Sequence, residues 1–198
     1  MIRTPRRKLN NEEIGQGGLP WNNDIYARLA SNRVIFLAED ISKETGSSLS
    51  AMLLYYDADN HDDITIYINC NGGDATALSN IYDVMQMIHS PVQTICIGKA
   101  YSAAAVLLAA GTAGKRFMTK HADVMIHGLQ VQYPLTESAG QIDSEIEYRI
   151  LKNHNTMLMK ILARHTEKDY RQIEKDCQRD YFMTSGDAMK YGMIDGIL

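Results

Sequence analysis

The chain contains two copies of one pattern, a short apolar segment, a turn of small residues and a helical segment, and this repeat most restricts the possible folds. In the first copy, a strand is expected at Ile64–Ile68 and a helix at Ile81–Ile88, with the turn Asn69–Gly73 after the strand. In the second copy, a strand expected at Val92–Ile97 leads into a helix at Ser102–Ala110. Repeated strand–turn–helix units build sheets with packed helices. The sequence therefore predicts an α/β fold, without the glycine fingerprint of a Rossmann domain.

Further elements are expected on both sides of this repeat. The last helix is expected to begin with Ser185 as its N-cap and to end at Gly192. A long helix carries apolar residues from Ile142 to Leu162, about six turns, which is more than one small core needs. We therefore expect it to protrude and serve oligomerisation. The other expected elements are a helix at 25–29, a strand at 34–37, a helix at 47–59, a strand at 124–126, a strand around Phe182 and a helix at 185–191.

Composition and charge exclude several classes of protein. The 198-residue chain has 45% hydrophobic residues, which suits one globular domain at 24–198 after a polar, mobile arm at 1–23. A net charge of −4 gives no broad attraction to nucleic acid or to anionic membranes. No signal-peptide pattern precedes the domain, and the longest apolar run, Ala103–Ala110, is too short to cross a bilayer. The three cysteines form neither a disulfide framework nor a metal motif, so a cytoplasmic protein without a metal site is expected.

The turns after the two strands hold the candidate chemistry. Ser102 stands where a strand passes into a helix of very small residues, and the free N–H groups of that helix start, beginning with Ala103, could stabilise an oxyanion. The turn at Gly72 and Gly73 can present a second backbone donor at Gly73. The alternative is structural: Ser102 is an N-cap and the glycines form a tight turn. The residues alone leave both interpretations open.

A nucleophilic serine needs a base and a carboxylate that orients it. His127 is the best candidate base, because an apolar strand delivers it to the edge where the turns gather. Asp180 precedes apolar residues of the closing strand and is the candidate carboxylate. A half-buried structural histidine and an ordinary surface acid are the alternatives. The other histidines are expected in solvated settings: His61 and His89 in polar connectors, His121 in a charged turn, and His154 and His165 on the long helix.

A set of ordered segments, from about Asp24 to Leu198, forms one combined pattern. These segments are Ile25–Leu29, Arg33–Leu37, Ile66–Asn69 with Gly72 and Gly73, Ile81–Asp83, Met85–Gln86, Gly98–Ser102, Leu107–Gly111, Gly114–Phe117, Val124–His127, Arg179–Asp180 and Tyr191–Asp195. Together they resemble one family, the proteolytic subunit of the Clp (caseinolytic) protease.

The resemblance implies a crotonase-like α/β domain and a serine endopeptidase that cleaves unfolded polypeptides. It places the catalytic residues at Ser102, His127 and Asp180, and the oxyanion donors at Gly73 and Ala103. It also implies two stacked heptameric rings joined through the long helix, and an AAA+ unfoldase that uses the ATP, so that this chain needs no cofactor. Arg179 is a candidate for coupling ring contacts to Asp180. The docking pocket for the unfoldase falls on Tyr67, Met87, Ile95, Ile97 and Phe117.

The chain departs from the family pattern beside both turns. Cys70 and Asn71 stand where the family has Ser-Pro, and Ser102 is followed by alanines where the family has Met-Gly-Ala. Two other functions stay open. One is a crotonase-type enzyme that acts on acyl-CoA thioesters and needs no serine nucleophile. The other is a catalytically impaired ring subunit that assembles with an active paralogue.

Overall fold

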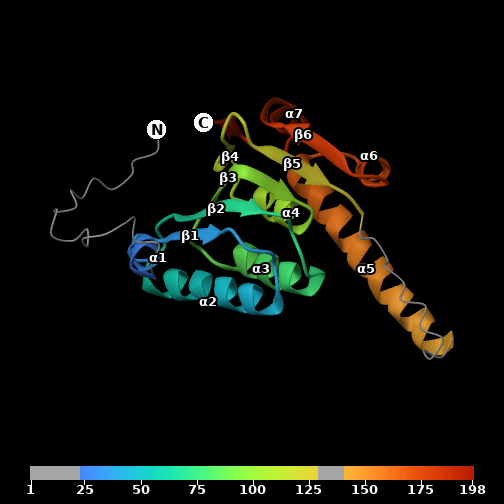
Figure 1. Ribbon diagram of the computed structural model, residues 1–198, viewed down its shortest axis with the longest axis horizontal. Helices are drawn as coiled ribbons and strands as arrows, with labels where there is room; N and C mark the ends of the chain where they lie inside the picture. The colour runs from blue at the N-terminus through green and yellow to red at the C-terminus, as the bar shows by residue number, and fades with distance from the viewer. Residues whose placement is uncertain (1–22, 129–140) are drawn as a thin grey trace, which may run out of the picture.

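A seven-stranded sheet runs through the computed structural model, which describes residues 23–128 and 141–198. Strands β1, β2, β3, β4 and β7 lie side by side and parallel, β5 pairs with β3, and β6 pairs antiparallel with β5. The strands are β1 Val34–Leu37, β2 Ile64–Cys70, β3 Val92–Tyr101, β4 Arg116–Met118, β5 Asp123–Ile126, β6 Tyr181–Thr184 and β7 Gly196–Ile197. The helices are α1 Asn23–Ala30, α2 Lys43–Asp59, α3 Ala75–Met87, α4 Ala103–Ala109, α5 Gln141–Thr166, α6 Tyr170–Asp176 and α7 Ser185–Tyr191. Figure 1 shows α2 and α3 together on one face of the sheet.

The predicted α/β class is confirmed, but caps set the helix starts earlier than apolar spacing indicates. Helix α2 begins at Lys43 because the Ser42 side chain accepts a hydrogen bond from Thr45 N–H at 3.1 Å. The Asp74 side chain likewise starts α3 by accepting from Ala77 N–H at 2.7 Å. Strand β3 continues to Tyr101, four residues beyond its expected end at Ile97.

The expected N-cap of the last helix is wrong. Thr184, not Ser185, accepts the capping hydrogen bond, from Asp187 N–H, while Ser185 Oγ donates to the carbonyl of Lys120. Gly192 ends the helix with φ 93°, in the left-handed conformation expected of it. The sequence prediction also missed β4, α6 and β7, which are short and lack a clear apolar period.

The sheet buries one face under helices and leaves the other partly open. Ile64, Ile66 and Ile68 of β2 are fully buried in the core with α2 and α3, while the alternate residue Tyr67 points to the opposite face. On that face the Tyr67 ring stacks on Phe36 with centroids 5.1 Å apart. Register pairing adds Ile95 beside Tyr67 and Phe117 beside Ile95. We call Phe36, Tyr67, Ile95 and Phe117 the apolar strip.

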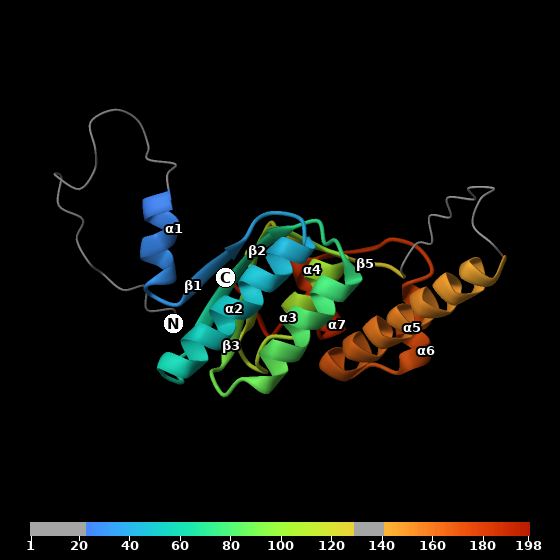
Figure 2. The ribbon, with the colours of Figure 1, turned by 90° about the horizontal axis from the view of Figure 1, so that it is seen from below.

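Helix α5 extends well beyond the sheet (Figures 1 and 2). Its C-terminal half is buried at Leu158 and Leu162 and packs against α4 and α6. Farther toward its N-terminus, the side chains of Tyr148 and Ile150 are about half exposed. The expected protrusion is therefore present, and oligomerisation through it stays a prediction. Residues 1–22, where the mobile arm is expected, lie outside the described part of the chain.

A partly buried ion pair connects the C-terminal segment to the core. Arg116 of β4 binds both carboxylate oxygens of Asp195, at 3.0 and 2.6 Å, and donates to the carbonyls of Ala109, His165 and Gly192. Burial raises the pKa of Asp195, but the hydrogen bonds from Arg116 outweigh it and hold this pKa below its ordinary value. One side chain therefore fixes the ends of α4, α5 and α7 around β4.

The solvated setting expected for His165 is wrong. Its ring lies edge-on to Tyr82 with centroids 5.7 Å apart, and its Nε2 is 3.2 Å from the Tyr82 hydroxyl. Burial, helped by the charges of Arg164 and Arg116, lowers the pKa of His165 to about 4. The long helix therefore packs this histidine against α3 in its neutral form.

None of the helices within 23–128 and 141–198 is both long and apolar enough to span a membrane.

Candidate active site

Ser102 occupies a strained turn between β3 and α4. Its φ is 54° and its ψ is −121°, a conformation that a non-glycine residue adopts only when its surroundings enforce it. The backbone N–H of Ser102 donates to the carbonyl of Met125 at 2.8 Å, which holds the turn against β5. Ser102 stands at the N-cap position of α4, as the structural alternative expects, but its side chain makes no capping hydrogen bond to the helix. A sharp strand-to-helix turn of this kind exposes a serine hydroxyl to a substrate.

His127 faces Ser102 directly. It follows the last residue of β5, and the parallel pairing of Tyr101 with Met125 brings it beside the end of β3. The Nε2 atom of His127 lies 2.8 Å from Ser102 Oγ, within hydrogen-bond distance. The imidazole side chain is only 21% exposed. The two residues are therefore placed as a nucleophile and its general base must be.

Asp180 reaches the second nitrogen of His127 through the antiparallel pairing of β5 and β6, which sets Ile126 opposite Tyr181. Its Oδ1 lies 3.4 Å from His127 Nδ1, within ion-pair range. This contact is not a hydrogen bond, and within the described residues the buried Nδ1 has no hydrogen-bond partner. The Asp180 side chain is 49% exposed and has room to rotate. The three groups lie in the order of a catalytic triad, but the hydrogen bond between His127 and Asp180 is not formed.

Gly72 and Gly73 bring the turn after β2 against the turn that holds Ser102. Their φ values, 101° and 148°, are strained for any residue with a side chain. A Cβ at Gly72 would lie 2.7 Å from the carbonyl oxygen of Tyr101 and 2.9 Å from Ala103 N, so only glycine permits this approach. These distances confirm the prediction that the two turns lie side by side.

Ile41 holds the glycine turn from the other side, and the sequence offered no signal for this role. Ile41 N–H donates to the carbonyl of Gly72 at 2.8 Å, and Asp74 N–H donates to the carbonyl of Ile41 at 2.7 Å. Within the described part of the chain, the N–H groups of Gly73 and Ala103 donate to no acceptor. Two free backbone donors beside a serine hydroxyl form a candidate oxyanion hole.

The Cys70 thiol supports the same turn from within the core. Its Sγ accepts a hydrogen bond from Gly72 N–H at 3.2 Å and donates to the carbonyl of Glu39 at 3.0 Å. Cys70 is 1% exposed, and this burial raises the pKa of its thiol, so the sulfur stays protonated and can keep both bonds. The residue that replaces the family's serine thus acts as a positioning residue.

We expect Cys70→Ala to lower kcat for a short peptide about three- to tenfold, because one hydrogen bond worth about 1 kcal/mol would no longer fix the glycine turn. KM should change less, since Cys70 does not line the cavity beside Ser102. Cys70→Ser should restore kcat, as a hydroxyl can also accept from Gly72 N–H. Cys96→Ala, at an equally buried cysteine, is the matched control. An unchanged kcat in Cys70→Ala would show that the thiol only fills space.

A small apolar pocket adjoins Ser102. Its volume is about 10 Å³, at the lower limit of the space that one water molecule needs. It is lined in part by Leu78, Val106, Ile126 and Leu158. A more open groove of about 300 Å³ runs past His127, Arg179 and Asp180. A bound substrate side chain would therefore have to widen the pocket, while the groove is already open.

Comparison with known protein families matches residues 17–198 to the family described as Clp protease. The chain belongs to the Clp protease family. A curated relative from Porphyromonas gingivalis (strain ATCC BAA-308 / W83), an ATP-dependent Clp protease proteolytic subunit, is 46% identical over 177 residues, which cover 88% of this chain and 78% of that protein. Membership of the Clp protease family confirms the predicted crotonase-like fold class and the predicted activity, that of a serine peptidase.

The residues predicted for the Clp unfoldase docking pocket are only partly gathered. Tyr67, Ile95 and Phe117 lie in one register row of the apolar strip, and Ile97 follows two residues along β3 on the same face. Met87 ends α3, which packs on the opposite face, and its side chain is 64% exposed. Four of the five predicted residues therefore share one face of the sheet while Met87 lies apart from them, and docking at this face stays a prediction.

Proposed function

We propose that Ser102, His127 and Asp180 form the catalytic triad of a Clp protease proteolytic subunit that cleaves unfolded polypeptides. The observation that carries the proposal is the 2.8 Å contact between His127 Nε2 and Ser102 Oγ at a strained strand-to-helix turn. An acyl-CoA enzyme of the crotonase type needs no such pair, so this contact favours the peptidase. Family membership supports the same choice.

The reaction proceeds by two acyl transfers. His127 Nε2 takes the proton of Ser102 as Oγ forms a bond to the carbonyl carbon of the peptide. Gly73 and Ala103 N–H groups stabilise the oxyanion, and Asp180 rotates to accept from Nδ1–H and holds the histidine tautomer. The C–N bond then breaks, and His127 gives its proton to the leaving amine. Water, deprotonated by His127, releases the acyl group and regenerates the serine hydroxyl.

The assembly of the protein is part of the same proposal. The half-exposed Tyr148 and Ile150 of the protruding α5 support self-association into two stacked heptameric rings, which enclose the active sites. The apolar strip supports docking of an AAA+ unfoldase that consumes ATP and feeds in unfolded chains. Arg179 lines the groove with Asp180, and contact of the neighbouring subunit with Arg179 turns the aspartate toward His127. Ring formation would thereby complete the triad. Such an assembly would work in the cytoplasm.

We expect Ile150→Glu to dissociate the assembly and to lower peptide hydrolysis together with the particle mass, because a charge would be buried at the helix contact. Light scattering of the unmodified chain should give the mass of a double heptamer of 22.2 kDa subunits. Met189→Glu, at a residue of α7 with similar exposure, is the control that should keep both mass and activity. A monomer or dimer that still degrades large unfolded chains would contradict the proposed chamber.

A further inference from the structure

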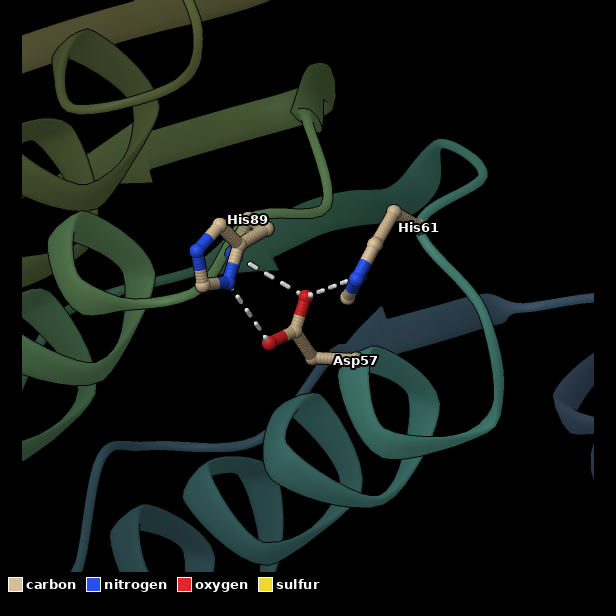
Figure 3. A group of neighbouring side chains, drawn as sticks. All are labelled: Asp57, His61 and His89. Atoms are coloured by element: carbon tan, nitrogen blue, oxygen red, sulfur yellow. Dashed lines mark hydrogen bonds and ion pairs between the residues drawn. The ribbon is translucent and has the colours of Figure 1, made fainter.

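A second group of reactive side chains lies at the end of the sheet opposite to Ser102. Asp57 is in the last turns of α2, His61 is in the connection to β2, and His89 is in the connection between α3 and β3 (Figure 3). These connections precede the N-terminal ends of β2 and β3, whereas Gly73 and Ser102 follow the C-terminal ends of the same strands. The peptidase mechanism uses none of the three residues.

The three side chains converge on one point. His61 Nδ1 lies 3.1 Å from Asp57 Oδ1, and His89 Nδ1 lies 3.7 Å from Asp57 Oδ2. One ligand atom from each residue can be chosen so that all three lie within 4.8 Å of one another. Ligand atoms around a tetrahedral Zn²⁺ at about 2.0–2.1 Å are separated by about 3.3 Å, and the 3.7 Å between His89 Nδ1 and Asp57 Oδ2 is close to this spacing. Asp57 lies in the last turn of α2, which ends at Asp59, and His61 follows two residues beyond that end.

Hydrogen bonds hold the carboxylate in one orientation. Asp57 Oδ1 accepts from Ser90 N–H at 2.8 Å, from Ser90 Oγ at 3.0 Å and from His89 N–H at 3.0 Å. The Arg33 guanidinium donates to Ser90 Oγ at 2.9 Å and fixes that hydroxyl in turn. Because Oδ1 is occupied by these donors, Oδ2 remains for a ligand. Outer hydrogen bonds of this kind orient the ligands of metal sites.

Both imidazoles are open to solvent, while the carboxylate is not. The side chains of His61 and His89 are 63% and 80% exposed, whereas that of Asp57 is 17% exposed. The two rings face each other with centroids 5.1 Å apart and planes inclined by 41°. Each ring can therefore turn its nitrogen toward a shared ion without disturbing the core, and the solvent side leaves a coordination position for water.

We propose that Asp57, His61 and His89 bind one divalent transition-metal ion, through Asp57 Oδ2 and one ring nitrogen of each histidine. Imidazole with a single carboxylate suits Zn²⁺, Ni²⁺ or Cu²⁺, whereas Mg²⁺ and Ca²⁺ prefer oxygen ligands alone. The ion joins the end of α2 to the turn before β3 and so stabilises the sheet end remote from the peptidase site. The cysteine pattern predicts a chain without a metal site. The proposed site uses no cysteine, and its two histidines and one aspartate come together only when the chain folds.

Zinc binding to the full-length chain tests the proposal, measured by equilibrium dialysis against Zn²⁺ followed by metal analysis. The unmodified protein should hold about one more Zn²⁺ per chain than the double variant His61→Ala/His89→Ala, and each single variant should bind that ion at least about tenfold more weakly. His121→Ala, at an exposed histidine elsewhere, is the matched control and should bind as the unmodified chain does. Comparison with the double variant removes any contribution from zinc at His127.

Thermal unfolding gives a second readout. Zn²⁺ should raise the unfolding midpoint of the unmodified chain and of His121→Ala by a few degrees, because a ligand that binds only the folded state stabilises it, and should not raise that of the double variant. Mg²⁺ at the same concentration should have no such effect. Because both histidines are exposed, the double variant should keep its fold and its metal-free peptidase activity. Equal zinc content and equal midpoint shifts in the unmodified chain and the double variant would overturn the proposal.

Discussion

Ser102→Ala is expected to lower kcat for a short fluorogenic peptide by at least about a thousandfold. Removal of the hydroxyl leaves no nucleophile for His127 to activate, and only peptide binding and the two backbone donors remain to accelerate hydrolysis by water. Alanine keeps the Cβ that the φ of 54° already tolerates, so the turn should be preserved. The assay compares kcat of the purified variants at saturating peptide.

Ser47→Ala provides the control for this experiment. Ser47 is an exposed helix residue whose hydroxyl donates to the carbonyl of Lys43 within its own helix, so its loss should leave kcat unchanged. Circular dichroism and particle mass of Ser102→Ala should match those of the unmodified chain. Peptide hydrolysis at an undiminished rate in Ser102→Ala would show that another group performs the attack.

Gly73→Ala should reduce kcat about a hundredfold or more and should also weaken folding. The added Cβ would overlap the carbonyl oxygen of Ile41, and the φ of 148° is strained for alanine. Relief of this overlap would move the Gly73 N–H, and loss of one oxyanion donor costs about 10²–10³ in kcat. The backbone strain should lower the free energy of unfolding by about 1–3 kcal/mol, measured by urea titration.

Gly186→Ala is the matched control for Gly73→Ala. Gly186 lies in α7, where the nearest heavy atom to an added Cβ is 3.9 Å away and no positive φ is imposed. Alanine should therefore be tolerated there, with kcat unchanged and stability equal or higher. If Gly73→Ala lost stability but kept its kcat, Gly73 would be a structural glycine and not an oxyanion donor.

Much of the fold could be predicted from the chain because its elements carry local signals. Apolar spacing located α2, α3 and α5, and apolar runs located β2, β3 and β5. Strands β4 and β7 were not predicted, because they are only three and two residues long and are defined by pairing with distant residues. The N-cap of α7 was placed one residue late because adjacent Thr184 and Ser185 are both good caps, and only the partner at Lys120 distinguishes them.

Part of the candidate site could also be predicted from the sequence, and part could not. Ser102, His127 and the paired glycines were predictable because each follows an apolar strand, and the ends of parallel strands gather at one edge of a sheet. The support of the glycine turn by Ile41, through Gly72 and Asp74, and of Ser102 by Met125 was not predictable, since these contacts are backbone hydrogen bonds between distant segments. The exposure of Asp180 and its 3.4 Å separation from His127 also depend on tertiary placement.

Labelling with a fluorophosphonate probe tests the central claim, that His127 activates Ser102 as a nucleophile, most directly. Such a probe phosphonylates only an activated serine, so intact-mass analysis should show one adduct per chain, and peptide mapping should locate it on Ser102. Ser102→Ala should not be labelled, and His127→Ala should be labelled far more slowly because no base takes the proton. An adduct on another serine, or labelling that is as fast without His127, would contradict the claim.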